Sequence, residues 1–406
     1  MKVVQINASC ERGSTGKIIV SISQLLHERG IENYILYSAG RSRTANEISC
    51  CNFLYTKFQA LKSRIFGNYG FNSIRETKRI IRHLERLQPD IVHLHNIHGH
   101  DCHLEMLFDY FRRKNIRLYW TFHDCWAFTG YCPYFDIIHC DRWKDRCHGC
   151  PQRKQYAWFV DRSCELYQRK KQAFSELDLT IITPSRWMED LVKQSFLKDY
   201  PVRVIHNGID LDVFKPTYGD FRKRYGIPVS KHILLGVAFG WDRRKGLDVF
   251  VELSRRLDPQ QFQIVLVGTN ERVDTQLPEN IISIHRTHDQ KELAEIYTAA
   301  DVFVNPTREE NYPTVNMESI ACGTPVLTFR TGGSPECLDD TCGCVVDCDD
   351  VDALEWEIYQ ICEQKNYTIV DCVKKAQNFD MYQQYKEYIY LYERRSSMDT
   401  QIMCKI

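Results

Sequence analysis

Long apolar runs, a signal sequence and a surplus of one charge are all missing from this chain. No run approaches the roughly 18 consecutive apolar residues that a membrane-spanning helix needs. Residues 1–7 have the pattern of a strand and lack the apolar segment of a signal peptide. Lys plus Arg and Asp plus Glu number 53 each, so no excess of positive charge favours nucleic acid. We therefore expect a cytoplasmic protein without a nucleic-acid partner.

The composition also excludes a disordered or a disulfide-stapled protein. Hydrophobic residues make up 43% of the chain, which suffices for ordinary globular folding. Its 406 residues exceed a single comfortable core and predict two domains. The 18 cysteines are mostly scattered singly, so we expect reduced thiols rather than a disulfide framework.

Two motifs that would bring phosphate or metal chemistry are incomplete. The segment from Gly13 to Lys17, Gly-Ser-Thr-Gly-Lys, suggests a P-loop. A P-loop requires Gly where Glu11 stands and Ser or Thr where Ile18 stands, so the motif fails. No Asp-x-Asp pair occupies a loop suited to a divalent cation, and we expect no catalytic metal.

The most informative stretch that is present begins with a short apolar strand at residues 301–306. Pro313 suits the first turn of a helix, because its missing N–H costs nothing there. Gly323 suits the end of that helix, and residues 325–328 would form the next strand. The pattern therefore predicts a strand–loop–helix–strand unit of an α/β sheet.

Two glutamates lie in this predicted unit. The free N–H groups around Thr314 and Val315 would face the carboxyl end of the preceding strand, where open α/β sheets bind anions. Glu310 would lie in the loop beside that end, and Glu318 more than one helical turn further on. The spacing of the two glutamates is either chance or a means of binding hydroxyl groups of a sugar and a ribose.

The spacing Glu310-x7-Glu318, followed by Cys322-Gly-Thr-Pro-Val326, resembles the nucleotide-sugar motif of the retaining glycosyltransferases of family 4, also called glycosyltransferase group 1. The resemblance extends to the bacterial polysaccharide-biosynthesis members, here with a cysteine-rich insertion. It implies the α/β fold named GT-B, in which two doubly wound Rossmann-like domains face each other across a cleft. The implied domains are residues 1–200, with the cysteine-rich insertion at 125–151, residues 201–378, and a C-terminal helix with a loose tail at 379–406.

The resemblance also implies roles for individual residues. Glu310 would hold sugar hydroxyls and Glu318 the ribose, while His123 would lie near the transferring sugar at the mouth of the cleft. Lys245 matches the diphosphate lysine of the family, and either Arg243 or Arg244 would replace a second arginine that is Gly240 here. The resemblance also implies that the backbone of the glycine loop, at Gly13 and Gly16, contacts the donor diphosphate; the alternative is that this loop is only a tight turn. Arg286 would lie in the segment that meets the nucleobase.

The implied activity is that of a metal-independent, hexosyltransferase-type enzyme. It would move a sugar from a UDP- or GDP-sugar to a glycan or lipid-linked acceptor in cell-surface polysaccharide biosynthesis, with retention of anomeric configuration. A nucleotide-sugar epimerase or hydrolase of the same fold is one alternative. A non-catalytic protein that binds nucleotide sugars is another.

The cysteine-rich insertion contains four thiols within a short loop. Cys147 and Cys150 have the C-x2-C spacing that lets two thiolates hold one ion, whereas Cys132 and Cys140 depart from zinc-ribbon spacing. The four are either ligands of a structural zinc ion, unliganded thiols or redox-active groups.

Residues 57–86 combine eight cations with aromatic and aliphatic side chains. Such a stretch either lies on an anionic membrane surface or forms helices whose cations face solvent. The first alternative would place the protein peripherally on the inner face of the plasma membrane. His93 and His95 would share one face of a strand, where we expect structural and acceptor-lining roles rather than a metal centre.

Overall fold

Two parallel β-sheets organise the chain in the computed structural model, which describes residues 1–403 and the side chains of residues 1–394. Each sheet belongs to its own compact unit. Unit 1 comprises residues 1–206 together with the C-terminal segment from Gln384, and unit 2 comprises residues 207–383.

The sheet of unit 1 has seven strands in the order β3-β2-β1-β4-β5-β6-β7, all parallel. Its central strands are buried along almost their whole length because helices cover both faces of a doubly wound sheet. The strands are β1 (Lys2–Cys10), β2 (Glu32–Gly40), β3 (Glu47–Ser49), β4 (Ile91–Leu94), β5 (Arg117–Thr121), β6 (Leu179–Thr183) and β7 (Val202–Val204).

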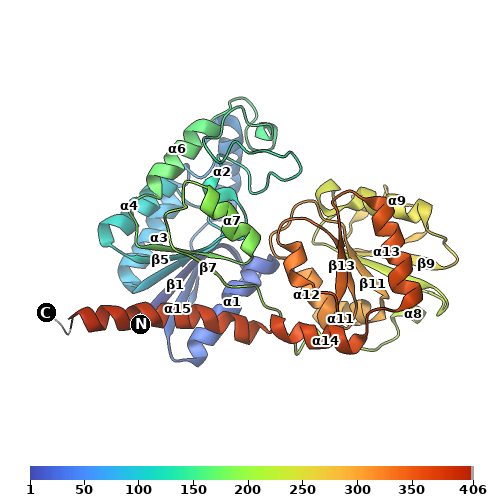
Figure 1. Ribbon diagram of the computed structural model, residues 1–406. Helices are drawn as coiled ribbons and strands as arrows, with labels where there is room; N and C mark the ends of the chain where they lie inside the picture. Colours follow the sequence, from blue (N-terminus) through green and yellow to red (C-terminus); the bar gives the residue numbers. More distant parts are fainter. Residues whose placement is uncertain (404–406) are drawn as a thin grey trace. The chain divides into compact units, whose positions relative to one another are not determined.

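The helices of unit 1 pack against both faces of this sheet (Figure 1). Helices α4 and α6 lie on one side of it, whereas α1 and the C-terminal helix α15 lie on the other. The helices are α1 (Gly13–Glu28), α2 (Phe53–Phe66), α3 (Ile74–Leu87), α4 (Leu104–Lys114), η1 (Trp126–Phe128), α5 (Arg153–Tyr156), α6 (Ser163–Ala173), α7 (Arg186–Gln194) and α15 (Met381–Met403).

Unit 2 repeats the same design with six parallel strands in the order β10-β9-β8-β11-β12-β13. The strands are β8 (His232–Val237), β9 (Phe262–Val267), β10 (Ile281–Ile284), β11 (Val302–Asn305), β12 (Val326–Phe329) and β13 (Gly343–Val346). The helices are α8 (Phe221–Arg224), η2 (Arg243–Lys245), α9 (Leu247–Arg256), α10 (Glu271–Asp274), α11 (Gln290–Ala299), α12 (Thr314–Ala321), η3 (Ser334–Cys337), α13 (Val351–Gln364), α14 (Ile369–Ala376) and η4 (Gln377–Phe379).

Both sheets have the strand order of a doubly wound Rossmann fold, so the predicted fold class is confirmed. The order reverses between β1 and β4 in unit 1 and between β8 and β11 in unit 2. Ligands of open α/β sheets bind beyond the carboxyl ends of the strands at this reversal. In unit 2 that point lies between the loops that follow β8 and β11.

The boundaries of the units differ from the expected domain limits. Strand β7 pairs with β6, so unit 1 extends beyond residue 200. The chain returns from unit 2 to unit 1 within α15. The later residues of this helix belong to unit 1, where Tyr119 Oη donates a hydrogen bond to Leu391 O at 3.1 Å. The tail expected to be loose from Ser396 is helical as far as Met403, because no glycine or proline interrupts it. Residues 404–406 lie outside the described part of the chain.

Candidate functional site

The loop after β8 is shaped by its own residues to present Lys245. Asp242 caps the single turn of η2 by accepting a hydrogen bond from Lys245 N at 3.0 Å. Gly246 follows with φ +75°, and a Cβ there would lie 2.4 Å from the carbonyl oxygen of Pro306. Only glycine therefore allows this loop to approach the end of β11 so closely.

Lys245 and Glu310 form the central ion pair of the site. Lys245 Nζ lies 2.5 Å from Glu310 Oε2, and the two side chains are only 18% and 16% exposed. The backbone of Glu310 is itself fixed, because Gly332 packs so tightly against it that any Cβ at 332 would overlap Glu310 O. The two loops at the reversal point of the sheet thus bring one cation and one carboxylate into direct contact.

The charge state of Glu310 follows from its surroundings. Burial by itself would raise the pKa of Glu310, but the Lys245 ammonium and the Arg244 guanidinium outweigh burial and hold that pKa below its ordinary value. Glu310 is therefore a carboxylate at neutral pH. A carboxylate accepts hydrogen bonds from hydroxyl groups and repels phosphate.

The two arginines beside Lys245 are not equivalent. Arg244 is half-buried, donates to Glu309 O at 3.4 Å and acts electrostatically on Glu310. Arg243 is exposed, and its carbonyl oxygen accepts a hydrogen bond from Arg308 at 2.5 Å. Arg244 is thus the arginine of the pair whose side chain adjoins the Lys245–Glu310 site.

Arg308 ties the two loops together and was not predicted from the sequence. Its guanidinium, 8% exposed, makes a bidentate contact with Asp248 at 2.8 and 2.9 Å and a third contact with Asp349 at 2.7 Å. Paired charges of this kind fix geometry, since both carboxylate oxygens are engaged. The three partners are far apart in sequence, so spacing alone gave no signal for them.

Helix α12 begins directly beside Glu310. Thr314 is its first residue and Pro313 its N-cap, one position later than predicted, and no described side chain caps this end. An uncapped N-terminus leaves the amides of Thr314 and Val315 available to an anion. Glu318, one turn further along, accepts a hydrogen bond from Tyr297 Oη of α11 at 3.2 Å. This contact between Tyr297 and Glu318 was not predicted from the sequence.

Arg286 lies apart from this cluster. It follows β10 at the edge of the sheet, is exposed, and is separated from β11 by β9 and β8 in the strand order. Its neighbour His285 pairs with Asp274 at 2.5 Å.

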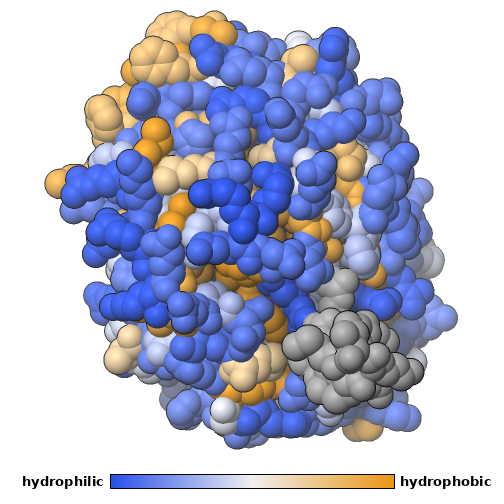
Figure 2. All heavy atoms as spheres, turned by 90° about the vertical axis from the view of Figure 1, so that its left-hand side faces the viewer, coloured by the Kyte–Doolittle hydropathy of each residue, from blue (hydrophilic) through white to orange (hydrophobic). Residues whose placement is uncertain are grey.

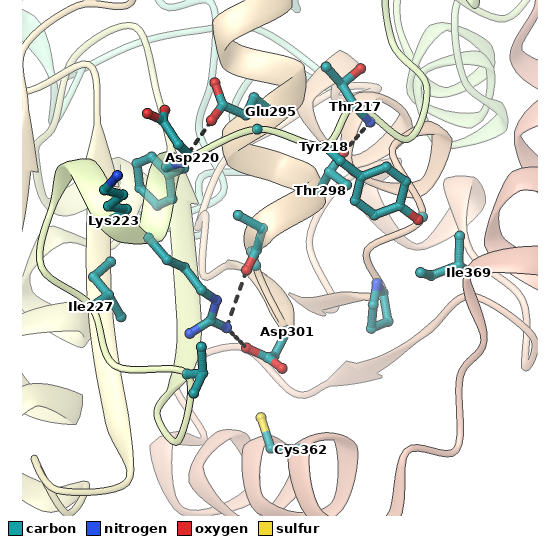
Figure 3. A pocket seen from close by; sticks show the side chains of 18 of the residues that line it. Thr217, Tyr218, Asp220, Lys223, Ile227, Glu295, Thr298, Asp301, Cys362 and Ile369 are labelled. Carbon is teal, nitrogen blue, oxygen red and sulfur yellow. Dashed lines mark hydrogen bonds and ion pairs between the residues drawn. The ribbon is translucent and has the colours of Figure 1, made fainter.

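A pocket of unit 2 lies at the opposite edge of the sheet, where the strands begin. It holds about 840 Å³ and is lined by Asp301 and Pro325, which directly precede β11 and β12, and by the end of α13 (Figure 3). Arg222 spans it with an ion pair to Asp301 at 2.9 Å. Because ligands of such sheets bind at the carboxyl ends of strands, we take the Lys245–Glu310 loops, and not this pocket, as the candidate site.

In unit 1, His123 follows β5 and has a defined neighbour. Its Nε2 lies 3.1 Å from Nδ1 of His95, which follows β4. Burial, reinforced by the charge of His98 and opposed by Asp124, lowers the pKa of His123 to about 4. His123 is therefore a neutral imidazole at physiological pH, able to donate or accept a hydrogen bond without carrying charge.

The neighbouring histidines have structural partners. His93 lies 2.8 Å from Thr121 Oγ1 and 2.6 Å from Tyr392 Oη of α15. His98 pairs with Asp124 at 2.9 Å, so the aspartate next to His123 engages a different histidine. These contacts agree with structural roles for His93 and His98.

The glycine loop of unit 1 is a tight strand-to-helix turn in the structure. Gly13 opens α1 with φ +69°, and a Cβ at Gly16 would lie 3.1 Å from Glu11 N. Glu11 forms an ion pair with Arg43. The backbone near both glycines lies beyond the carboxyl end of β1, at the reversal point of this sheet.

The four insertion cysteines gather around one loop. The charges of Cys140, Cys147 and Cys150 all contribute, after burial, to the raised pKa of Cys132. Cys147 Sγ accepts a hydrogen bond from Gly130 N at 3.2 Å. Nevertheless, no three His, Cys, Asp or Glu side chains within residues 1–394 are arranged so that they could hold a metal ion. The buried Trp143 packs against Phe128 and Phe135, and this contact helps to stabilise the loop.

No helix in the described part of the chain is long and apolar enough to cross a bilayer.

Two family models match the chain. The model described as Glycosyltransferase Family 4 matches residues 15–213, and the one described as Glycosyl transferases group 1 matches residues 231–364. The colanic acid biosynthesis glycosyl transferase WcaC of Escherichia coli K12 is 23% identical over 363 residues, which cover 84% of this chain and 86% of that protein.

Solved structures share the fold at low sequence identity. Sucrose-phosphate synthase from Thermosynechococcus elongatus has a TM-score of 0.71 and 17% identity, covering 98% of this chain and 100% of its own. Anabaena HepE in complex with UDP-glucose has a TM-score of 0.70 and 13% identity, covering 97% and 100%.

Proposed function

Because this chain belongs to family 4, or group 1, of the glycosyltransferases and has their GT-B fold, we propose that it uses a nucleotide-sugar donor and retains anomeric configuration. The donor is a UDP- or GDP-sugar, and the acceptor is a glycan or lipid-linked saccharide of cell-surface polysaccharide biosynthesis. The relative named for colanic acid biosynthesis and the neighbour crystallised with UDP-glucose support this choice.

The observation that carries the proposal is the Lys245–Glu310 pair at the reversal point of the second sheet. A diphosphate needs cations and amide donors, whereas a sugar needs acceptors for its hydroxyl groups. Lys245, Arg244 and the uncapped start of α12 supply the first set, and Glu310 supplies the second. Glu318, held by Tyr297, is suited to ribose hydroxyls one turn deeper.

The proposed chemistry is a single front-face displacement. The acceptor oxygen forms a bond to the anomeric carbon as the bond from that carbon to the diphosphate oxygen breaks. The proton of the acceptor hydroxyl passes to the departing phosphate. Lys245, Arg244 and the amides of Thr314 and Val315 stabilise the negative charge that develops there, so the proposal needs no catalytic metal.

The remaining predicted residues have supporting roles in this proposal. His123 contacts the transferring sugar as a neutral hydrogen-bonding group, since its pKa is far below physiological pH. The backbone at Gly13 and Gly16 approaches the diphosphate, and Arg286 adjoins the nucleobase. The enzyme would act in the cytoplasm.

A pair of substitutions tests the separate roles proposed for Glu310 and Glu318. Glu318→Ala should weaken binding of UDP or GDP and of the nucleotide sugar, because it removes the ribose acceptor. Glu310→Ala should spare the free nucleotide but weaken the nucleotide sugar and slow transfer. Calorimetry with free nucleotides and with a panel of nucleotide sugars measures both. Equal losses of free-nucleotide affinity in the two variants would refute the assignment.

The same panel separates the alternatives. Release of free sugar without any acceptor would indicate a hydrolase, and a changed sugar on the nucleotide an epimerase. Binding without turnover, with every acceptor supplied, would indicate a non-catalytic binding protein.

A further inference from the structure

Helix α2 is amphipathic, but unlike an ordinary surface helix it buries polar side chains and exposes apolar ones. Its two buried residues are polar, Gln59 at 3% and Ser63 at 1% exposure. Its outward residues are apolar: Leu54 is 74%, Phe58 60% and Leu61 47% exposed. The spacing of 54, 58 and 61 places these three side chains on one face of the helix. α2 therefore presents an apolar stripe to solvent.

Hydrogen bonds fix α2 in this orientation. Ser63 Oγ accepts a hydrogen bond from Asn72 Nδ2 at 2.7 Å and lies 3.3 Å from His100 Nδ1. Gly67 directly follows the helix, and its amide donates to Ser63 O at 2.7 Å. A rotation that buried the apolar stripe would break the buried contacts of Ser63, which is costly for polar groups removed from water.

The next helix shows the ordinary pattern. Helix α3 buries Ile80 and Leu84 and exposes Lys78, Arg79 and Arg82. The two alternatives for residues 57–86 therefore separate: α3 has the solvated cationic face of a surface helix, and α2 does not.

A second segment extends the apolar surface. Trp158 N donates to Arg64 O at 2.7 Å, which holds residues 158–160 against the end of α2. Trp158, Phe159 and Val160 are 46%, 71% and 44% exposed. Figure 2 shows apolar side chains gathered at the upper edge of this face, the end of unit 1 where Figure 1 labels α2. We call the following set the apolar face: Phe53, Leu54, Phe58, Leu61, Phe66, Trp158, Phe159 and Val160.

Cations accompany the apolar face. Helix α2 carries Lys57, Lys62 and Arg64 and has no acidic residue. Lys57 Nζ lies 4.5 Å from the ring centroid of Phe53, so one cation directly adjoins the exposed aromatic side chains. Aromatic and aliphatic side chains interleaved with cations match the boundary between acyl chains and anionic headgroups.

We propose that the apolar face docks this protein on an anionic lipid bilayer, with α2 lying in the plane of the interface. The apolar side chains enter the headgroup–acyl boundary while Lys57, Lys62 and Arg64 contact lipid phosphates. A second copy of this chain is a poor occupant, because a two-fold contact would bring the same cations of both copies together. The inference extends the proposed function, since a membrane-held enzyme meets a lipid-linked acceptor, and rests on it only for that acceptor.

Vesicle flotation of the full chain tests the docking surface. Vesicles of phosphatidylcholine with phosphatidylglycerol should bind the protein, and binding should fall at high salt. The triple variant Phe58→Ser, Leu61→Ser, Phe159→Ser and the triple variant Lys57→Gln, Lys62→Gln, Arg64→Gln should each weaken binding by more than about tenfold. All six side chains are surface groups outside the donor site, so UDP or GDP affinity should be unchanged.

A matched control uses apolar side chains that are equally exposed on unit 2. Val229 and Val370 are 93% and 74% exposed, and the variant Val229→Ser, Val370→Ser should float like the unchanged protein. The proposal is overturned if the unchanged protein does not float, or if the apolar-face variant floats equally well. The membrane proposal is also overturned if sedimentation shows that the unchanged protein is a dimer, and if the apolar-face variant loses the dimer but still floats. Failure of the transferase proposal would appear differently, as a protein that floats but binds no nucleotide.

Discussion

Lys245 and Glu310 form an ion pair, so a diphosphate that binds Lys245 must compete with the Glu310 carboxylate for it. Lys245→Ala should weaken binding of UDP or GDP by about 2 kcal/mol or more, because a partly desolvated cation–phosphate contact is lost. Calorimetry measures the loss directly. Lys223→Ala, an exposed lysine of the same unit, is the control and should bind normally. Unchanged affinity of the Lys245 variant would disprove the phosphate contact.

The same pair makes a pH-dependent contribution to stability. The folded-state pKa of Glu310 lies below its unfolded value, so the contribution is present above pH ~4.3, the ordinary carboxyl pKa, and is lost as pH falls through the folded value. Lys245→Ala removes this contribution. The difference in thermal midpoint between the two proteins should be largest near neutral pH and should shrink below pH ~4. A difference independent of pH would show that the lysine stabilises the fold by packing alone.

Single residues also mark the limit of inference from sequence. The Glu-x7-Glu spacing and the basic loop predicted Glu310, Glu318 and Lys245 as site residues, and in the structure Lys245 pairs with Glu310. Arg308 and Tyr297 were missed, because their partners are distant in sequence. The choice between Arg243 and Arg244 depended on which side chain turns inward, and adjacent positions give no periodic signal for that.

Among the elements of unit 1, the insertion loop brings four cysteines together. We propose that Cys132, Cys140, Cys147 and Cys150 hold one structural zinc ion. The thiols are neighbours but do not form a ready coordination shell, so binding must draw them together. Lys170, fully buried and bonded to Trp126 O and Thr129 O at 2.7 and 3.0 Å, would balance the charge of a zinc–thiolate centre.

Purified protein should accordingly contain about one zinc ion per chain. Cys147→Ser and Cys150→Ser should lose the metal and lower the thermal midpoint, because closed thiolate sites contribute folding energy. Cys164→Ser, on α6 and outside the four, is the matched control. Elemental analysis without zinc, together with four freely titrating thiols, would refute the zinc site.

Elements themselves were largely predictable, since apolar runs and glycine breaks located the strands and helices around residues 301–328. The orientation of α2 was not. Its apolar residues recur at helical spacing, which normally predicts a buried face, whereas the buried side chains are Gln59 and Ser63. Periodicity identifies a face of a helix but cannot tell which partner that face meets.

Helix α15 carries the chain from unit 2 back to unit 1 and supplies buried contacts to unit 1. Tyr392→Phe should destabilise unit 1 by about 1–3 kcal/mol, because it leaves Nδ1 of the buried His93 without the Tyr392 hydroxyl. Denaturant unfolding measures the change. Tyr390→Phe, at a position 45% exposed on the same helix, should have little effect. Equal stability of both variants would show that the His93 contact contributes nothing.

The course of α15 has a consequence for biosynthesis. A ribosome completes the sheet of unit 1 and the whole of unit 2 before it adds the residues that cover β4 and β5. Until then His93, Tyr119 and Thr121 lack their partners on α15, so the first half of the nascent chain cannot reach its final state on its own. Folding of the first unit therefore finishes after that of the second, and a chain cut short before Gln384 would have an intact second unit and an open first one.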